Sequence, residues 1–490
     1  MTPLEGRLAV VSNRLPAVAH KTDGRWSVRP GSGGLVTAMA PILRNRGGLW
    51  IGWPGTSADV DLGGLLAEAG RETGYDLRPV VLTPEEERDF YHGFSNEILW
   101  PLFHDMPTRC NMDPSYWATY GVVNRKFAKV IMECTGADDT IWVHDYHLMS
   151  TARELRERGA NRPIGFFLHI PFPGPDIFLK LPWRAQVLED LLQYDLLGFQ
   201  SLRDRHNFVQ CLRTLFKDVR VQGKGRVVTV FCRDREARLG VFPIGIDYDS
   251  FVRESASEEA AKRAWEIHYN LPDRQIILGV DRLDYTKGIP QRLEAFRRAL
   301  IRYPEMMERV TLVQIVVPSR EDIPEYQALK IEIESLVGEI NGLLTRSGWV
   351  PIHYIFRSLD RDQLLGYYRT AEIALITPLR DGMNLVAKEY CACSLEENGV
   401  LILSEFAGAA AELQRGAIIV NPFDSEAIGD AIVRGFRMNP EERRARMKKL
   451  RQTIRKHDIF WWVDSFLRAA VAKDLNDFPP LGESFHPVPE

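Results

Sequence analysis

The sequence predicts an α/β fold made of two doubly wound, parallel-sheet domains. Short apolar runs alternate with amphipathic helical stretches along almost the whole chain of 490 residues. The runs are continuously apolar rather than alternating, which is typical of parallel strands buried on both faces. A repeated strand–helix order places helices on both faces of each sheet. The length suits roughly two to four domains, and the runs fall into two series.

The first series of apolar runs predicts the strands of an N-terminal domain. These strands are expected over Leu8–Ser12, Leu49–Trp53, Thr140–His144, Ile164–His169, Leu196–Phe199, Val227–Phe231 and Gly240–Phe242. The second series predicts a C-terminal domain, with strands over Ile276–Val280, Val310–Val317, Ile352–Ile355, Ile373–Thr377 and Val400–Ser404. Helical patterns lie between strands, for example over Pro290–Tyr303 and Arg361–Thr370.

The boundary between the two domains is predicted within Phe242–Phe251. A strand ends there near a proline and a glycine, and a new helical segment begins. We therefore assign residues 1–245 to the first domain and residues 246–465 to the second. Residues 466–490 are expected to finish a helix and to form a tail that packs back toward the N-terminal domain, since their prolines cannot continue a helix.

Composition and charge exclude several classes of protein. The chain has 62 Lys and Arg against 66 Asp and Glu, a formal net charge of −4, whereas a general nucleic-acid binder is normally basic. No apolar stretch reaches the roughly 18 residues of a membrane span, and the first residues do not resemble a signal peptide. We therefore expect a cytoplasmic protein without nucleic-acid or membrane partners. Its six cysteines lack the paired spacing of a zinc site, which predicts reduced thiols.

Ligands of open α/β sheets bind at the carboxyl ends of the strands, so polar residues directly after predicted strands are candidate site residues. Asn13 and Arg14 follow the first strand, and Gly33 and Gly34 precede a helix that starts near Leu35. Glycines there let a phosphate or sugar approach backbone N–H groups, although a plain glycine-rich turn is an equal alternative. The spacing is not GxGxxG, which argues against a dinucleotide-binding dehydrogenase.

Asp145 and His169 lie at the ends of two further predicted strands and are expected at the same edge of one sheet. A carboxylate at that edge can hold sugar hydroxyls, and a histidine can form a hydrogen bond with one. The alternative for His169 is a core histidine whose hydrogen bonds stay within the protein. His144 and His147 flank Asp145, but their spacing does not make a good zinc-ligand set.

Arg282 and Lys287 follow the strand that ends at Val280. Two cations at the mouth of a sheet suit a diphosphate, whose negative charge grows when it leaves. The alternative is a pair of ordinary surface cations, which more often lie on helix faces.

The segment Thr377–Tyr390 predicts an anion-binding turn. A strand ends near Thr377, Asp381 and Gly382 make the turn, and a helix is predicted from about Asn384. The first N–H groups of that helix would face an anion, and the helix dipole would add to the attraction. Glu389, one turn further along, could accept hydrogen bonds from ribose hydroxyls, as acidic residues do in other nucleotide sites; a packed helix carboxylate is the alternative.

Ten motifs, in this order, resemble those of the trehalose-6-phosphate synthase family. They are VSNRLP, FSNEILWPLFH, VHDYHLM, FFLHIPFP, DLLGFQ, FPIGID, DRLDYTKG, PSREDIPEY, TPLRDGMNLVAKEY and LSEFAGAA, and they extend from about Leu8 to about Leu467. The resemblance implies a GT-B fold, in which two Rossmann-like domains face each other across a cleft. The N-terminal domain would bind the acceptor and the C-terminal domain the nucleotide sugar.

The same resemblance implies an activity. The family transfers glucose from a nucleotide-glucose to glucose 6-phosphate with retention at the anomeric carbon, in trehalose biosynthesis and osmoprotection. It implies no cofactor and no required metal. UDP-glucose is the expected donor, although the residues leave the base open among uracil, guanine and adenine. The partners expected are the two substrates, and a homo-oligomer is left open.

Site roles carry over residue by residue from the resemblance. The residues implied in catalysis are His169, Asp381, Arg282 and Lys287. The donor-binding set is Gly33, Gly34, His169, Arg282, Lys287, Asp381, Gly382, Met383, Asn384, Leu385, Val386, Ala387, Lys388 and Glu389. The acceptor-binding set is Arg14, Trp53, Tyr91, Trp100, Asp145 and Arg320, in which the two arginines are expected to bind the acceptor phosphate.

The match to the family is poorest between Phe103 and Trp117. That stretch is nearer to glucosylglycerol-phosphate synthases, relatives that use glycerol 3-phosphate as the acceptor, so this acceptor is kept as an alternative. A sugar-phosphate sensor without activity is a second alternative. It is disfavoured because the donor cations and Asp381 are intact.

Overall fold

The computed structural model describes residues 6–22, 25–31, 34–57, 60–320, 323–472 and 478. These residues form two compact units. Unit 1 comprises the chain up to Ile244 together with the segment from Ile459 onward, and unit 2 comprises Gly245–Asp458. The chain therefore leaves unit 1 once and returns to it with its last helix, α19 (Ile459–Val471).

Unit 1 is built on a nine-stranded sheet of order β5-β4-β1-β6-β7-β8-β11-β10-β9, with a separate β2–β3 hairpin. The strands are β1 (Leu8–Arg14), β2 (Ala17–Thr22), β3 (Arg25–Pro30), β4 (Leu49–Trp53), β5 (Asp76–Pro79), β6 (Thr140–His144), β7 (Ile164–Phe167), β8 (Leu196–Phe199), β9 (Arg220–Gln222), β10 (Val227–Cys232) and β11 (Arg235–Val241). Pairing is parallel from β5 to β11 along this order.

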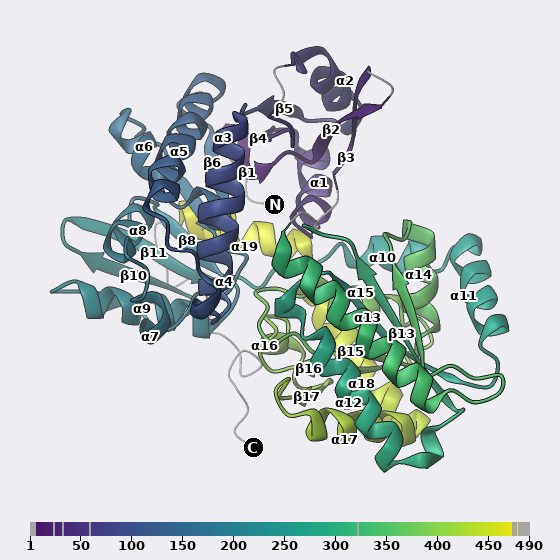
Figure 1. Ribbon diagram of the computed structural model, residues 1–490. Helices are drawn as coiled ribbons and strands as arrows, with labels where there is room; N and C mark the ends of the chain where they lie inside the picture. Colours follow the sequence, from purple (N-terminus) through teal and green to yellow (C-terminus); the bar gives the residue numbers. More distant parts are fainter. Residues whose placement is uncertain are drawn as a thin grey trace. The chain divides into compact units, whose positions relative to one another are not determined.

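The helices of unit 1 cover both faces of this sheet (Figure 1). Those before β6 are α1 (Gly34–Arg46), α2 (Gly63–Thr73), α3 (Pro84–Glu86), the π-helix η1 (Glu87–Leu99), α4 (Trp100–Phe103), η2 (Pro107–Arg109) and α5 (Pro114–Cys134). After β6 follow η3 (Tyr146–Leu148), α6 (Thr151–Glu157), α7 (Pro175–Phe178), α8 (Arg184–Leu191) and α9 (Leu202–Leu215).

Helix α19 packs directly on the sheet of unit 1. The ring of Phe466 stacks on Trp142 of β6 with centroids 4.2 Å apart. Gly165 and Gly198, in β7 and β8, make room for the same ring, since a Cβ at either position would lie 2.8–2.9 Å from it. Trp462 is fully buried, and its indole N–H donates to the Phe242 carbonyl at 3.0 Å.

Unit 2 is built on a six-stranded, wholly parallel sheet of order β14-β13-β12-β15-β16-β17. The strands are β12 (Gln275–Arg282), β13 (Val310–Val317), β14 (Ile352–Phe356), β15 (Ile373–Ile376), β16 (Val400–Ser404) and β17 (Ile418–Val420). The helices are α10 (Tyr248–Ser255), α11 (Glu258–Asn270), η4 (Tyr285–Lys287), α12 (Ile289–Arg302), η5 (Pro304–Met306), α13 (Pro324–Leu344), α14 (Arg361–Thr370), α15 (Leu385–Cys393), α16 (Ala410–Leu413), α17 (Ser425–Arg437) and α18 (Pro440–Lys456).

The sheet of unit 2 lies between two helical layers, as doubly wound architecture requires (Figure 1). The apolar faces of α12, α13 and α17 form one hydrophobic core with the strands. Helices α14, α15 and α18 contact the sheet as well, and α10 and α11 pack on this layer. Capping sets the start of several helices; at α14, for example, Asp360 and Gln363 form a reciprocal capping box.

The predicted α/β fold class is confirmed, and each predicted strand is present, with ends that differ by at most two residues in every case but one. The exception is β11, which begins at Arg235 rather than at Gly240. One part of the prediction is wrong: β10, expected over Val227–Phe231 in a parallel series, runs antiparallel to β11 and β9. Only Arg233 and Asp234 separate β10 from β11, and a two-residue loop can join antiparallel strands alone.

The second domain was predicted to extend to residue 465, whereas unit 2 ends at Asp458. The difference arises because α19 begins at Ile459 and belongs to unit 1. The binding role assigned to each domain stays a prediction. Most of the predicted tail, residues 473–477 and 479–490, lies outside the described residues.

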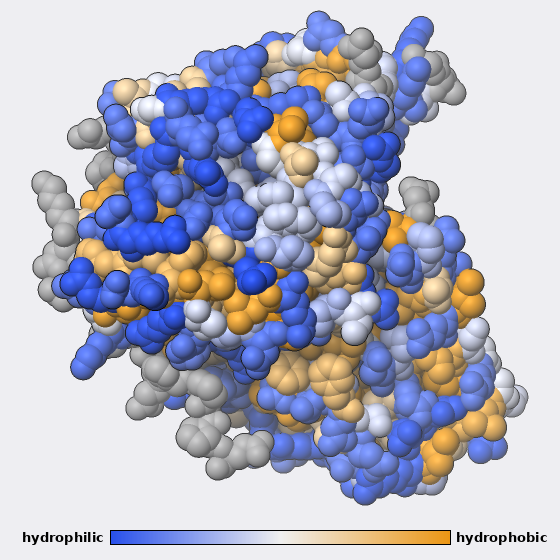
Figure 2. All heavy atoms as spheres, turned by 60° about the vertical axis from the view of Figure 1, so that its left-hand side comes forward, coloured by the Kyte–Doolittle hydropathy of each residue, from blue (hydrophilic) through white to orange (hydrophobic). Residues whose placement is uncertain are grey.

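Hydrophilic side chains cover most of the face in Figure 2, with apolar ones interspersed among them, which is ordinary for a protein surface. None of the described helices is long and apolar enough to span a membrane.

Candidate functional site

The two predicted donor cations of unit 2 lie at the end of β12 and in the loop that follows it. Arg282 is the last residue of β12 and is exposed. Asp284 then organises the loop, because its Oδ1 accepts hydrogen bonds from the N–H and hydroxyl of Thr286, both at 3.0 Å. Gly288 ends the loop with a φ of 63°, and a Cβ there would lie 2.6 Å from the Thr377 carbonyl oxygen. The conformation of the loop that holds Lys287 is therefore fixed by the Asp284–Thr286 hydrogen bonds and by the close approach of Gly288 to Thr377.

The loop after β15 carries Asp381, whose backbone is fixed by the segment after β16. The N–H of Asp381 donates to the Phe406 carbonyl at 3.2 Å, and the Asp381 carbonyl accepts from Gly408 N–H at 2.9 Å. Asn384 has a φ of 64° and caps α15, with its side chain accepting from Ala387 N–H at 3.1 Å. The predicted turn and helix start are thus present in the structure, with Gly382 buried between them.

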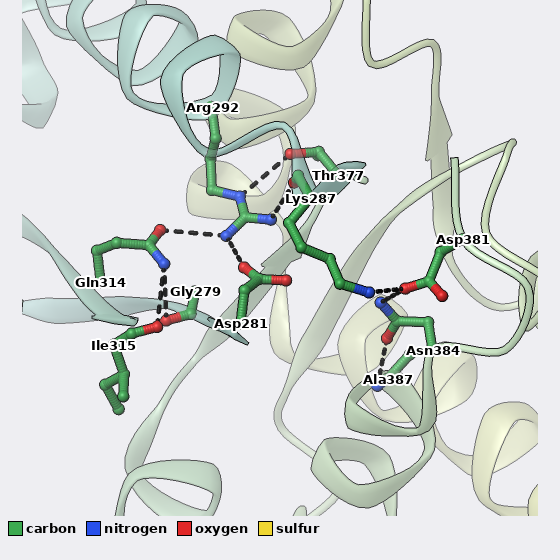
Figure 3. Close-up of polar contacts among 10 residues, drawn as sticks. All are labelled: Gly279, Asp281, Lys287, Arg292, Gln314, Ile315, Thr377, Asp381, Asn384 and Ala387. Carbon is green, nitrogen blue, oxygen red and sulfur yellow. Dashed lines mark hydrogen bonds and ion pairs between the residues drawn. The ribbon is translucent and has the colours of Figure 1, made fainter. Parts of the chain in front are cut away.

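Lys287 and Asp381 form an ion pair, with Nζ and Oδ2 2.6 Å apart (Figure 3). Their side chains are only 12% and 11% exposed. The same Oδ2 accepts from the Asn384 side chain at 3.2 Å, and Oδ1 accepts from Met383 N–H at 3.4 Å. The structure therefore brings together a cation, a carboxylate and a helix N-terminus at the carboxyl edge of one sheet, where ligands of such sheets bind.

Two members of the predicted donor set have side chains engaged within unit 2. Lys388 forms a buried ion pair with Glu412, and Glu412 also contacts Nδ1 of His457 at 3.0 Å. Glu389 accepts a hydrogen bond from the Tyr368 hydroxyl at 2.8 Å. Burial raises the pKa of the Glu389 carboxyl, although this hydrogen bond lowers it. The remaining members, Leu385, Val386 and Ala387, form the first turn of α15.

In unit 1, Asp145 and His169 come together as predicted, because β6 and β7 are neighbouring parallel strands. His169 N–H donates to Oδ1 of Asp145 at 3.2 Å. Asp145 has φ 74° and ψ 167°, a region that residues other than glycine adopt only under strain, and such strain concentrates at functional sites.

His169 also contacts a second histidine, with its Nε2 3.1 Å from Nδ1 of His144. Both rings are buried beside Trp462 of α19. Burial lowers the pKa of His169 to about 3, and burial followed by the neighbouring His169 lowers the pKa of His144 well below its usual value. Both rings are therefore neutral near neutral pH.

Arg14 lies over an aromatic pair. Its guanidinium carbon is 4.1 Å from the ring centroid of Trp53 and 5.0 Å from that of Tyr91. Trp53 is fully buried, and its indole N–H donates to the Thr56 carbonyl at 2.9 Å. Trp53 therefore supports Arg14 through a cation–π contact.

The π-helix η1 carries Tyr91, and Trp100 follows directly at the start of α4. π-Helices are rare and are frequent at functional sites. The Asn96 side chain donates to the Tyr91 carbonyl at 2.7 Å and accepts from the Tyr146 hydroxyl at 3.1 Å. Trp100 is 7% exposed and packs against His104 and Tyr146.

For three predicted site residues, Arg320, Gly33 and Gly34, the structure gives little support for a binding role. Arg320 lies in unit 2, where its Nη1 donates to the Tyr326 hydroxyl at 2.5 Å. Arg14 lies in unit 1, so their convergence on one phosphate stays a prediction. Gly34 is the first residue of α1, and Gly33 lies outside the described residues.

Sequence reasoning missed the buried groups behind the loops, above all Arg292 and its partner Asp281. The only signal available for Arg292 was a charged residue one turn into the predicted helix, next to the apolar Leu293. No group of three or more His, Cys, Asp or Glu in the described part of the chain is placed to hold a metal ion.

Two doubly wound units, one with a cation, a carboxylate and a helix N-terminus at its strand ends, match the architecture of GT-B glycosyltransferases, the class to which the solved structures named below belong. The chain belongs to glycosyltransferase family 20, whose sequence model matches residues 6–472.

Sequence relatives support the assignment to this family. The chain is 41% identical to alpha,alpha-trehalose-phosphate synthase [UDP-forming] A of Dictyostelium discoideum over 95% of its length, but it spans only 63% of that protein. It is also 41% identical to a trehalose-6-phosphate synthase of Mycolicibacterium vanbaalenii, covering 95% of this chain and 96% of the relative.

Solved structures agree with it too. The chain is 35% identical to an alpha,alpha-trehalose-phosphate synthase (UDP-forming) from Burkholderia xenovorans in complex with glucose-6-phosphate, with a TM-score of 0.86 over 95% of this chain and 100% of that one. An E. coli structure, named for trehalose-6-phosphate and bound with UDP-2-fluoro glucose, is 37% identical, with a TM-score of 0.85 over 95% and 99%. The family resemblance and the GT-B fold class are confirmed, and none of these relatives supports the glycerol 3-phosphate alternative.

Proposed function

We propose that this enzyme transfers glucose from UDP-glucose to glucose 6-phosphate, with retention, giving trehalose 6-phosphate and UDP. The observation that carries the proposal is the group formed by Lys287, Asp381 and the N-terminus of α15, in a chain of family 20. Two of the relatives named above are described as UDP-forming trehalose-phosphate synthases, and one of these two was solved in complex with glucose-6-phosphate.

The residues divide the chemistry as follows. Arg282 and Lys287 neutralise the charge that develops on the leaving diphosphate, with the N–H groups at the start of α15 as further donors. Asp381 orients hydroxyls of the donor glucose, with His169 as a second partner. The leaving phosphate takes the proton of the acceptor hydroxyl, so the protein contributes positioning and charge stabilisation rather than a nucleophile.

The acceptor half rests on Arg14 and the aromatic residues of unit 1. A guanidinium fork matches phosphate oxygens, and the Arg14 guanidinium is held over Trp53 and Tyr91. The aromatic surface of Tyr91 and Trp100 suits a pyranose ring better than a three-carbon acceptor. Asp145 would hold acceptor hydroxyls.

An assay of several nucleotide-glucoses against several phosphorylated acceptors tests the proposal. UDP-glucose with glucose 6-phosphate should be the best pair, and Trp100→Ala should lose mainly this activity. Arg282→Ala and Lys287→Ala should each lose about 2–4 kcal/mol of transition-state stabilisation, the scale of removing one such group. A clear preference for glycerol 3-phosphate, or near wild-type turnover of either cation variant, would contradict the proposal.

We further propose that transfer needs no metal ion, since the two cations supply positive charge at the diphosphate. Treatment with EDTA should leave turnover unchanged, and a loss that Mg²⁺ restores would contradict this. A cytoplasmic location stays a prediction, and the oligomeric state stays open.

A further inference from the structure

Arg292 lies one turn into α12, directly behind the donor loops, and its side chain is fully buried. Its guanidinium reaches four partners on separate segments (Figure 3). Nη1 donates to Oδ2 of Asp281 at 2.5 Å and to Oε1 of Gln314 at 3.1 Å. Nε donates to the Thr377 hydroxyl at 3.1 Å, and Nη2 to the Lys287 carbonyl at 3.4 Å.

The partners of Arg292 adjoin the proposed donor contacts. Asp281 precedes Arg282 in β12, and Thr377 directly follows β15, at the base of the loop that carries Asp381. The two loops are also joined to each other, because Leu379 N–H donates to the Thr286 carbonyl at 2.8 Å. One buried guanidinium thus links the main chain of the loop that bears the cation to the base of the loop that bears the carboxylate.

The sequence of the strands leaves space for this arrangement. A Cβ at Gly279 would lie 2.4 Å from Oε1 of Gln314 and 2.8 Å from Nη1 of Arg292. The Gln314 amide, in turn, donates to the Gly279 carbonyl at 3.3 Å. A side chain at position 279 would therefore push the guanidinium away from its partners.

Stability alone gives a poor reason for such a pair. Burying two charges costs desolvation, and replacing a buried ion pair by apolar groups of similar size is often neutral or stabilising. The hydrogen bonds of Arg292 instead fix loop geometry, and misplacing reacting groups by about 1 Å can cost roughly 100-fold in rate.

We propose that Arg292, together with Asp281, is a positioning residue for glucose transfer. It fixes the position of the Lys287 main chain relative to the base of the loop that carries Asp381. The diphosphate can then contact Lys287 while the glucose contacts Asp381. Being fully buried, Arg292 acts through these loops rather than on the substrate. The inference rests on the proposed function of the same site.

The decisive variant replaces both charges, Arg292→Met with Asp281→Leu, so that neither is left uncompensated. We expect a melting temperature close to that of the wild type, a loss of kcat of about 10- to 100-fold and weaker UDP binding by calorimetry. The KM for glucose 6-phosphate should change little. Arg292→Lys keeps the charge but not the fork, so it should restore part of kcat.

Arg443→Met is the matched control in the same unit. Arg443 is also buried, but it donates to Oε1 of Gln275, at the opposite end of β12 from Arg282, and to the Gly435 carbonyl. This variant should lower the melting temperature while leaving kcat per folded molecule and UDP affinity unchanged.

If the double variant keeps wild-type kcat and UDP affinity, the inference is wrong. If the double variant does not fold, Thr377→Val tests the inference instead, because it removes only the hydrogen bond from Nε of Arg292 to the Thr377 hydroxyl. A loss of kcat of about fivefold at an unchanged melting temperature would support the inference, and unchanged kcat would overturn it. If the wild-type enzyme shows no glucose transfer from UDP-glucose to glucose 6-phosphate, the proposed function is refuted instead. The UDP affinities of the same variants would then still test the positioning role of Arg292.

Discussion

At the residue scale, Lys287 and Asp381 neutralise each other across 2.6 Å. In the proposed function, the diphosphate of the donor pairs with Lys287, and hydroxyls of the donor glucose bind the carboxylate of Asp381. The whole donor would then give both residues a partner, whereas UDP alone would have to compete with Asp381 for Lys287.

Asp381→Asn separates these two effects. We expect tighter binding of UDP, by roughly fivefold because about 1 kcal/mol of competing ion pairing is removed, together with a large loss of transfer. Calorimetry with UDP and steady-state turnover measure the two quantities. Asp430→Asn is the control, since this exposed carboxylate of the same unit pairs with Arg302 and should affect neither. Weaker UDP binding in Asp381→Asn would contradict the competition.

Glu389→Gln tests two roles of one carboxylate. If Glu389 accepts from ribose hydroxyls, the variant should weaken UDP binding by about 1 kcal/mol, the scale of one hydrogen bond. An unchanged affinity would assign Glu389 to packing with Tyr368.

The same variant should show a pH effect on stability. Because burial raises the folded-state pKa of Glu389, the unfolded chain releases this proton first, near about pH 4.3, and the wild type loses stability as pH rises above that value. Glu389→Gln lacks the penalty, so its melting temperature relative to the wild type should increase from about pH 4 to about pH 7. A constant difference would contradict this.

At the scale of elements, α19 packs beside the carboxyl ends of β6 and β7, where His144 is the last residue of β6 and His169 lies two residues after β7. Both histidines are held neutral by burial, whereas in the unfolded chain they titrate near pH 6.5. The unfolded state then binds more protons below about pH 6.5, so acid removes stability until the folded-state pKa is reached, which for His169 is about 3.

His144→Gln should reduce this sensitivity to acid. Lowering the pH from about 6.5 to about 5 should cost the wild type roughly 2 kcal/mol through His169. Because the pKa of His144 is also lowered, the variant should lose less stability than the wild type over the same range. Denaturant unfolding at each pH, followed by tryptophan fluorescence, measures this. His206→Gln, at an exposed position, is the control, and an equal acid loss in both variants would contradict the prediction.

At the scale of the whole molecule, the proposed function assigns the UDP part of the donor to unit 2, and Arg14 and the aromatic acceptor residues to unit 1. Hydrogen exchange can test this assignment without any assumption about how the units are arranged. UDP at about 100 times its Kd should add roughly 2.7 kcal/mol of stability to the unit that binds it.

We therefore expect UDP to slow exchange in residues 284–288 and 381–389 of unit 2. Glucose 6-phosphate should slow exchange around Trp53 and over 91–100 in unit 1. Lys287→Ala should lose most of the UDP effect and keep that of glucose 6-phosphate. Protection by UDP confined to unit 1 would reverse the assignment.

The sequence by itself determined the α/β class and the strand ends that carry Asp145, His169, Lys287 and Asp381, since a continuous apolar run followed by a polar residue is a local signal. It also determined the family, because motifs spread over most of the chain are specific. It did not determine the direction of β10, which depends on a two-residue turn. It predicted a return to the N-terminal domain from residue 466, whereas the structure begins this return at Ile459, with the whole of α19.

Only the tertiary structure decided which partner each polar side chain takes. It paired Lys287 with Asp381 across 94 positions of sequence, Glu389 with Tyr368, and Arg292 with Asp281 and Thr377. Such contacts depend on the crossing of strands and helices that are distant in sequence. The sequence does not distinguish a buried arginine from a surface arginine. Burial is a property of the folded chain, and it decides both the energetics and the role of the side chain.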